Sequence, residues 1–213
     1  MARGVIRAGL LCGVLAPLLW AGMIVAAGEL RPGFDHVAQY ISELSERASA
    51  NAGFMRYGGF VASGLLHVAY AAAFYAALRR RSERHYLILL VAVLIALNGL
   101  GRIGAGLYAC APGCAAPEDP VQRLHSLAAT VAFLAIAAAA LFGGLLFRNA
   151  RGMSALSLYS LATGVAGLLF LGLMSAGDVS RVGLYERLAS GVLSLWVLVT
   201  ALRLNTLDND PDT

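Results

Sequence analysis

The sequence predicts an all-α fold, a polytopic transmembrane bundle of six helices with one extracytoplasmic amphipathic helix. Hydrophobic residues make up 59% of the 213 residues and charged residues only 13%, and the mean hydropathy is +0.73. Soluble domains are about 45–50% apolar and about 25% charged, so both departures indicate a lipid environment. The apolar residues form long continuous runs, which favours membrane helices over the alternating strands of a barrel.

Six runs of roughly 20 apolar residues have the length of a helix that spans a bilayer. They leave no segment long enough for a separate soluble domain, so we expect residues 1–203 to form a single six-helix membrane domain. The polar, acidic residues 204–213 are expected to form a disordered cytoplasmic tail. The six runs are residues 9–28, 57–78, 86–108, 124–147, 153–174 and 185–202.

Arginine sets the expected orientation, because all 16 residues of the lysine and arginine class are arginines. Six spans place both termini on one side, which carries nine arginines against seven on the other. The excess is concentrated in the short connector LRRRSERHY, residues 78–86, as is typical of cytoplasmic loops. We therefore expect a multi-pass protein of the cell inner (plasma) membrane with both termini cytoplasmic. The net charge of +4 then reflects topology, and no nucleic-acid partner is expected.

The longest extracytoplasmic loop contains the segment DHVAQYISELSERA, residues 35–48. Its apolar residues recur at helical spacing and its polar residues fall largely on the opposite face, which predicts an amphipathic helix with Asp35 as N-cap. We expect this helix to pack on the outer rim of the bundle. The apolar positions are Val37, Tyr40, Ile41, Leu44 and Ala48.

Two of the three cysteines, Cys110 and Cys114, lie in the polar loop of residues 108–125. Disulfides form and persist outside the cytoplasm, and the proline-glycine spacer between these cysteines can turn tightly enough to join the sulfurs. The sequence therefore predicts a Cys110–Cys114 disulfide. The alternative is a zinc site with His36 and His125 as further ligands, but the spacing matches no closed zinc module. We expect no metal and no other cofactor.

Four motifs together resemble a known family. In chain order they are LRPGFDHVAQYISELS at residues 30–45, CAPGC at residues 110–114, the histidine at His125 that opens the next helix, and GLYERL at residues 183–188. Over nearly the whole chain, this pattern is similar to the prokaryotic six-helix membrane family catalogued as domain of unknown function 998. The resemblance implies the fold and the topology. It implies no activity, because the family is named for lacking one.

Polar residues inside the spans mark candidate functional sites, because they are costly to place in a bilayer. Ser63 and His67 are four residues apart near the middle of the second span and share one helix face. Asn98 lies at a similar depth in the third span. A serine beside a histidine is the arrangement of a catalytic nucleophile and its base. The alternative, which we favour, is that His67 hydrogen-bonds Asn98 or a backbone carbonyl and holds helices together.

Ionisable residues also gather at the expected outer rim of the bundle. They are Glu29, Arg102, His125, Asp178, Glu186 and Arg187, with Ser42 and Glu43 placed to cover them. The functional interpretation is a pocket for an anionic or zwitterionic head group, bound by Arg102, Glu29, Glu43 and Arg187. His125 with Asp178 or Glu186 would then form an acid–base pair. The alternative, which we favour slightly for these residues, is a ring of salt bridges that fixes the register of the helices.

Three functions remain in view. The leading hypothesis is an integral membrane protein without catalytic activity that binds a lipid head group or a small ligand at this ring. The alternative is a membrane-embedded hydrolase or lipid-remodelling enzyme that uses the ring or the Ser63 and His67 pair. The third is a small transporter with a path past His67 and Asn98. Membrane lipids are the expected partners in each case, and the sequence leaves the oligomeric state open.

Overall fold

A computed structural model describes residues 2–177 and 179–209, and every regular element in these ranges is helical. Six long helices form the bundle: α1 (Arg3–Glu29), α2 (Ala62–Leu78), α3 (His85–Leu107), α4 (Pro120–Phe147), α5 (Ser157–Ser175) and α6 (Val182–Asn209). Four shorter elements flank them: the 3₁₀ helices η1 (Ile41–Ser45), η3 (Pro112–Cys114) and η4 (Ser154–Leu156), and the π-helix η2 (Phe54–Val61), which leads directly into α2.

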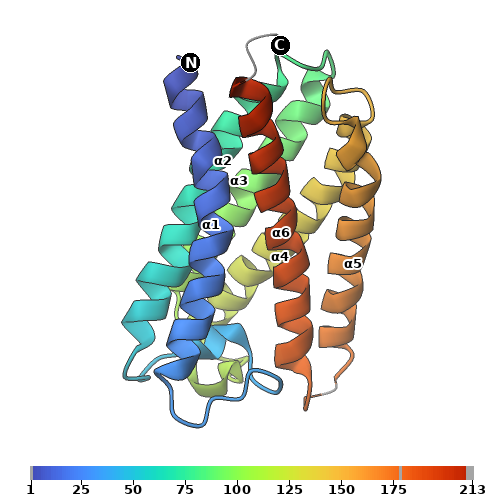
Figure 1. Cartoon of the computed structure of the whole chain (residues 1–213). Coiled ribbons are helices and arrows are strands. Elements are labelled where there is room, and N and C mark those ends of the chain that lie inside the picture. The colour runs from blue at the N-terminus through green and yellow to red at the C-terminus, as the bar shows by residue number, and fades with distance from the viewer. Residues whose placement is uncertain (1, 178, 210–213) are drawn as a thin grey trace.

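All six predicted spans are confirmed as helices long and apolar enough to cross a membrane. The helices run side by side, and α1 begins at the end of the bundle where α6 ends (Figure 1). We call this end the termini end, and the opposite end, which carries residues 30–53 and 108–119, the loop end. Large apolar side chains remain exposed along the outer faces, for example Leu15, Leu127 and Leu169 at 54%, 62% and 58%. An apolar surface of this extent suits lipid rather than water.

Two clusters of buried side chains hold the bundle together. The larger cluster lies toward the termini end and includes Tyr70, Phe74, Phe147 and Trp196. Within it, the Nε1–H of Trp196 donates to Ser160 Oγ at 2.9 Å, and the hydroxyl oxygens of Tyr70 and Thr200 are 2.9 Å apart. The smaller cluster lies at the loop end and joins α1, η1, η2 and α3. Its members are Trp20, Met23, Ala27, Ile41, Leu44, Met55, Phe60 and Ala105.

The prediction of an amphipathic helix over residues 35–48 is wrong. Residues 35–48 form turns around the five-residue η1, although Ile41 and Leu44 are buried as an amphipathic helix would bury them. Asp35 begins a turn, as expected of a cap, and accepts from the backbone N–H of Val37 at 2.7 Å. The backbone N–H of Ile41 then donates to Glu186 Oε2 of α6 at 2.6 Å. Because side chains take the hydrogen bonds that a helix would use, the segment folds as a covered loop.

The prediction of disorder in the tail is also wrong for residues 204–209, because α6 continues to Asn209. Leu204 and Leu207 are only 1% and 8% exposed and pack in the larger cluster. Arg81 Nη2 donates to the backbone carbonyl of Leu207 at 2.6 Å, so the last turn of the helix is anchored to the α2–α3 connector. Burial of two leucines therefore outweighs the polar composition of the segment. Residues 210–213 lie outside the described residues.

Glycine allows α3 and α4 to approach closely near the loop end. A Cβ at Gly101 would lie 2.6 Å from the carbonyl oxygen of Ala128 and 2.8 Å from the amide nitrogen of Ala132. Both are backbone atoms, so a side chain at this position requires the two helices to separate.

We expect Gly101→Ala to lower the free energy of unfolding by about 1–3 kcal/mol, as overpacking does in other cores. Thermal or denaturant unfolding in detergent measures this change. Gly22→Ala in α1 is the matched control, because no atom lies within 4 Å of its Cβ position. Equal stability of the two variants would contradict the close contact between α3 and α4.

Candidate functional site

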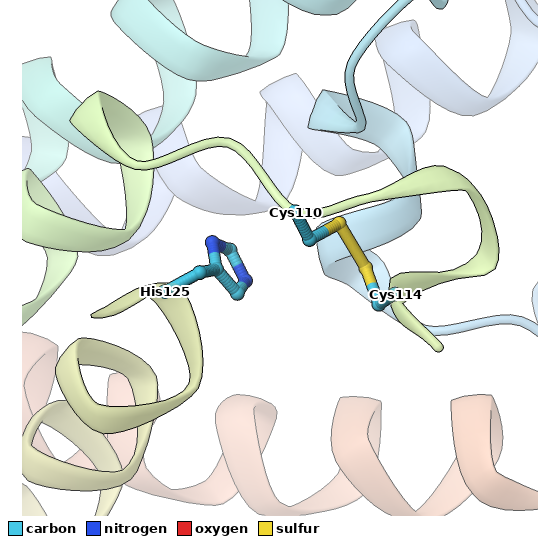
Figure 2. A group of neighbouring side chains, drawn as sticks. All are labelled: Cys110, Cys114 and His125. Carbon is cyan, nitrogen blue, oxygen red and sulfur yellow. A yellow bond between two sulfur atoms is a disulfide. The ribbon is translucent and has the colours of Figure 1, made fainter. Parts of the chain in front are cut away.

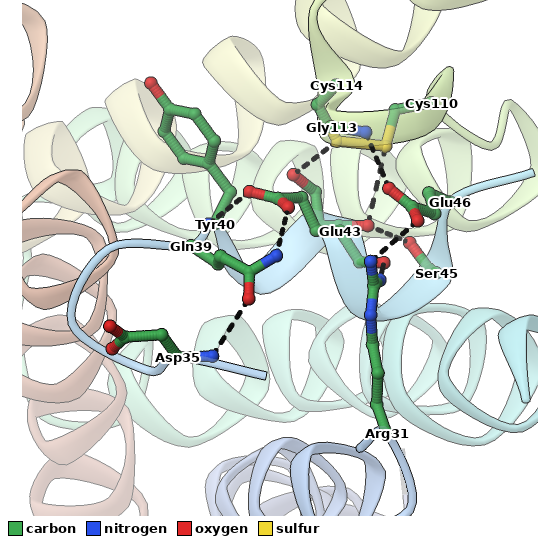
Figure 3. A network of polar contacts seen from close by, with 11 residues as sticks. Arg31, Asp35, Gln39, Tyr40, Glu43, Ser45, Glu46, Cys110, Gly113 and Cys114 are labelled. Carbon is green, nitrogen blue, oxygen red and sulfur yellow. Dashed lines mark hydrogen bonds and ion pairs between the residues drawn. A yellow bond between two sulfur atoms is a disulfide. The ribbon is translucent and has the colours of Figure 1, made fainter. Parts of the chain in front are cut away.

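The predicted disulfide is confirmed. Cys110 and Cys114 are bridged, with their Cα atoms 5.0 Å apart. Gly113 turns the chain between them with a φ of 65°, and its N–H donates to Glu46 Oε2 at 2.7 Å. The hydroxyl of Ser42 lies 3.2 Å from Cys114 Sγ. The disulfide loop is therefore bound to the segment 41–46, far from it in sequence (Figure 3).

Charged side chains of the long loop hold that loop in place. Arg31 pairs with Glu46 at 2.7 Å and also donates to the carbonyl oxygen of Glu43. The carboxylate of Glu43 accepts from the backbone N–H of Tyr40 at 2.9 Å and from Gln39 Nε2 at 2.7 Å (Figure 3). Both oxygens of Glu43 are thus engaged within the loop, and this side chain does not reach the cavity described next.

An outer cavity of about 320 Å³ lies at the loop end between α4, α5 and the start of α6. An inner chamber of about 40 Å³ lies deeper, among α1, η2, α3, α4 and α6. The two spaces adjoin, because they share the lining residues Ser42, His125, Ala129, Phe133 and Glu186. Of the predicted ring, Arg102, His125 and Glu186 meet here.

Arg102 lines the inner chamber and is only 8% exposed. Its guanidinium carbon lies 4.2 Å from the ring centroid of Trp20, a cation–π contact. Trp20 is itself oriented by the hydrogen bond from its Nε1–H to Ser190 Oγ at 2.8 Å. The Nε and Nη1 donors of Arg102 are buried and have no hydrogen-bond partner, and no carboxylate of the described residues pairs with it.

Asn98 lies one helical turn before Arg102 and lines the same chamber. Its Nδ2 donates to the carbonyl oxygen of Ala132 at 2.9 Å, which fixes the orientation of the amide because a carbonyl only accepts. Its Oδ1 is buried without a partner. The chamber therefore contains two unpaired donors and one unpaired acceptor. The four-residue spacing of these two polar residues in the third span is the sequence signal that links them.

His125 lies between the two spaces and is 3% exposed. Its Nδ1 lies 3.0 Å from the carbonyl oxygen of Ala105 and 2.8 Å from that of Tyr108, so Nδ1 carries the proton. The ring extends toward the disulfide, and His125 offers a nitrogen within 4.8 Å of both sulfurs (Figure 2). Bridged sulfurs are not thiolates, so these three residues supply no zinc ligand set in the oxidised protein.

Glu186 lines both spaces and is 7% exposed. Its Oε2 accepts the backbone N–H of Ile41, so one carboxylate oxygen holds the loop against α6. Tyr40 lies on the long loop next to Glu186. Burial raises the pKa of Tyr40, and the carboxylates of Glu186 and Glu43 add a smaller contribution. Tyr40 lines the outer cavity and therefore stays a neutral phenol there.

The remaining ring residues are placed elsewhere. Arg187 donates from Nη1 to the carbonyl oxygen of Gln39 at 2.7 Å and from Nε to His36 Nδ1 at 3.2 Å. Burial, and secondarily the Arg187 charge, lower the pKa of His36, consistent with a neutral acceptor ring. Glu29 is exposed at the end of α1. Asp178 lies outside the described residues.

The Ser63 and His67 side chains have separate partners. The Ser63 hydroxyl donates to the carbonyl oxygen of Phe60 at 3.3 Å, and His67 Nδ1 donates to the backbone carbonyl of Ser63 at 2.7 Å. They are 0% and 1% exposed, and neither lines the outer cavity or the inner chamber. This geometry is that of helix packing and not of a nucleophile with its base.

Six spans and a polar cavity at the loop end define a polytopic membrane protein with a candidate ligand site. The chain belongs to the family described as Protein of unknown function (DUF998), whose pattern matches residues 14–203. No curated protein and no solved structure matches the chain.

Thiol counting tests the disulfide. We expect one reactive thiol per denatured chain without reductant, that of Cys12, and three after reduction. Cys110→Ser with Cys114→Ser removes the bridge and should lower the free energy of unfolding by about 2 kcal/mol. Cys12→Ser is the matched control and should leave no reactive thiol in the oxidised protein. Three reactive thiols before reduction would contradict the bridge.

A second prediction concerns Asp119, the N-cap of α4, which accepts from Val121 N at 2.7 Å and pairs with Arg47 of the long loop. The Arg47 hydrogen bond, with help from the backbone amides, lowers the pKa of Asp119. A lowered pKa in the folded state means that the charged form stabilises the fold above the unfolded-state pKa, near about 4. This stabilisation is lost as the pH falls through the folded-state pKa.

Asp119→Asn keeps a good N-cap but removes the charge. We expect this variant to be less stable than the wild type near neutral pH, and the difference to decrease in acid, as the pH falls below the unfolded-state value of about 4 toward the lowered folded-state pKa. Unfolding midpoints near neutral pH and in acid measure this. A difference that stays constant with pH would assign the effect to the cap and not to the ion pair.

Proposed function

We propose that this membrane protein binds the anionic head group of a lipid, or another small anionic ligand, in the inner chamber at the loop end. The observation that carries the proposal is the buried Arg102 guanidinium, whose charge no described carboxylate balances. An uncompensated buried charge destabilises a fold by several kcal/mol. An anion in the chamber would supply the missing partner.

Guanidinium groups suit this task, because they stay charged and present several donors to carboxylate or phosphate oxygens. Desolvation strengthens such charge-assisted hydrogen bonds. Trp20 covers one face of the Arg102 guanidinium, so a ligand would meet its edge and its free donors. The adjoining outer cavity of about 320 Å³ is large enough for the rest of a small ligand.

The proposal includes the orientation expected from the sequence, with the loop end outside the cytoplasm and both termini within it. The Cys110–Cys114 bridge supports this placement, because disulfides persist in oxidising compartments. The arginine-rich connector at the termini end agrees with it. The inner (plasma) membrane is the membrane proposed.

A membrane-embedded hydrolase or lipid-remodelling enzyme is the second candidate, and the geometry of His125 favours it. With Nδ1–H held by two carbonyl oxygens, Nε2 is left as the acceptor and so as a potential base. His125 shares the outer cavity with the hydroxyl of Ser42 and the carboxylate of Glu186. The transporter hypothesis gains no such support, since His67 is packed between helices.

Substitution of Arg102 tests the binding function. We expect Arg102→Gln to weaken binding of an anionic lipid by about tenfold to a hundredfold, because hydrogen bonds to charged groups contribute about 1.5–3 kcal/mol. Native mass spectrometry of lipids retained by the purified protein measures this. The ligand-free variant should unfold at the same or a higher temperature, since an unbalanced buried charge has been removed.

Two controls accompany this experiment. Arg102→Lys keeps the charge and should retain part of the binding. Arg187→Gln removes a half-buried arginine at the loop end that lines neither the outer cavity nor the inner chamber, so it should leave binding unchanged. Full retention of the anionic ligand by Arg102→Gln, or strong destabilisation of that variant without ligand, would contradict the proposal and favour a purely structural role.

A further inference from the structure

We infer that the ligand is a lipid with a small anionic head that bears a hydroxyl or a P–OH group, and that its acyl chain lies in a cleft between α4 and α5. This inference rests on the anion site proposed above and names the class of ligand that the site takes. Phosphatidic acid, a phosphomonoester lipid, is the simplest molecule with this chemistry.

The wall of the outer cavity is divided into a polar and an apolar part. The polar part contains Gln122, Ser126 and Glu186, and the apolar part contains Phe133 and Leu134 of α4 with Leu171 and Met174 from the last turns of α5. Leu134 is about 20 Å along α4 from Pro120 at 1.5 Å per residue. For a helix that crosses the bilayer from Pro120 to Phe147, this distance puts Leu134 at the level of the hydrocarbon. A water-soluble anion has no part that would match this apolar wall.

The cavity reaches the outer surface of the bundle. Leu134 is 50% exposed and lines the cavity, and Ser175 at the end of α5 is exposed and lines it as well. Leu134 lies among the apolar residues of the outer face, which lipid would cover. The cleft is therefore accessible from the side of the bundle, at the level of the acyl chains.

The same two helices are in close contact toward the termini end. A Cβ at Gly144 would lie 2.6 Å from Leu161 Cγ, and one at Gly164 would lie 2.5 Å from Leu141 Cγ. The hydroxyl of Ser157 donates to the carbonyl oxygen of Gly144 at 2.8 Å. In Figure 1, α4 and α5 diverge from this contact toward the loop end. The cleft therefore ends where the two helices come into contact, toward the termini end.

The long loop covers the site from the loop end. Ile41 and Leu44 are 0% and 2% exposed, and Ser42 lines both the outer cavity and the inner chamber. The disulfide and the Arg31–Glu46 pair hold this segment down (Figure 3). The long loop covers the site on the aqueous side, and the cavity is open toward the side of the bundle. A ligand would therefore enter more directly from the bilayer than from water.

The unpaired atoms of the inner chamber specify the head. Two donors of Arg102 require acceptor oxygens with negative charge, and Oδ1 of Asn98 requires a donor. A phosphomonoester that keeps one proton, or a phosphate beside a hydroxyl, offers both. The chamber of about 40 Å³ accepts a small group only. A choline head would bring a bulky cation toward Arg102, so it does not fit.

The test uses the full-length protein in detergent with three probes: dioleoylphosphatidic acid, dioleoylphosphatidylcholine and glycerol 3-phosphate. Lipid binding is measured by native mass spectrometry and glycerol 3-phosphate binding by calorimetry. Thr130→Trp fills the cleft, because Thr130 is exposed and lines the outer cavity. Leu127→Trp is the matched control, because Leu127 lies on the outer face of the same helix, is 62% exposed and lines neither space. Leu134→Trp is a second cleft-filling variant should the first fold poorly.

We expect the wild type to bind phosphatidic acid at least tenfold more tightly than either of the other probes. Thr130→Trp should weaken phosphatidic acid binding at least tenfold, and Leu127→Trp should leave it unchanged. Equal affinity for glycerol 3-phosphate, or unchanged phosphatidic acid binding when the cleft is filled, overturns the lipid assignment but leaves the anion site standing. Equal affinity for phosphatidylcholine overturns the assignment of the head. If the wild type binds none of the probes, the anion site fails too.

Discussion

The guanidinium of Arg102 lies against the face of Trp20, in a bundle whose described carboxylates are all engaged elsewhere or too distant to pair with it. A stacked aromatic ring compensates a buried cation only in part. The constraint extends outward, because Trp20 is fixed by Ser190 of α6 and Asn98 is fixed by the backbone of α4. Four helices, α1, α3, α4 and α6, are thus arranged around one unsatisfied charge. Such an arrangement lowers the stability of the ligand-free bundle, because a buried charge without a partner is costly.

Hydropathy was sufficient to predict the spans, because the length of an apolar run reports directly on the thickness of the hydrocarbon layer. Two adjacent segments could not be predicted in the same way. Residues 35–48 have the periodicity of a helix, but the hydrogen bond from Ile41 to Glu186 connects positions 145 residues apart, and no local pattern contains it. Residues 204–209 are polar in composition, yet Leu204 and Leu207 bury on the bundle and extend the helix.

The sequence indicated the level along the bundle at which the candidate residues lie, but not the direction in which their side chains point. Sequence position places Glu186 and Arg187 at the same level of the bundle, but neighbours on a helix point about 100° apart. The structure directs Glu186 toward the cavity and Arg187 toward His36 on the other side. Glu43 was expected to contact a ligand, and its oxygens are instead taken by Tyr40 and Gln39. The face of each helix that turns inward depends on how the helices pack together. Local patterns in a single sequence do not reveal this packing.

The way in which the loop is fastened has a consequence for dynamics. Residues 41–46 are joined to the disulfide loop, and the N–H of Arg47 donates to the carbonyl oxygen of Cys110 at 2.9 Å. A loop that is held by this many contacts resists opening. The span that contains α5, in contrast, has the smallest buried share of the six, 22%. Exchange of a bound molecule would then proceed by a sideways displacement of α5. Its rate would follow the fluidity and thickness of the surrounding bilayer rather than the viscosity of water.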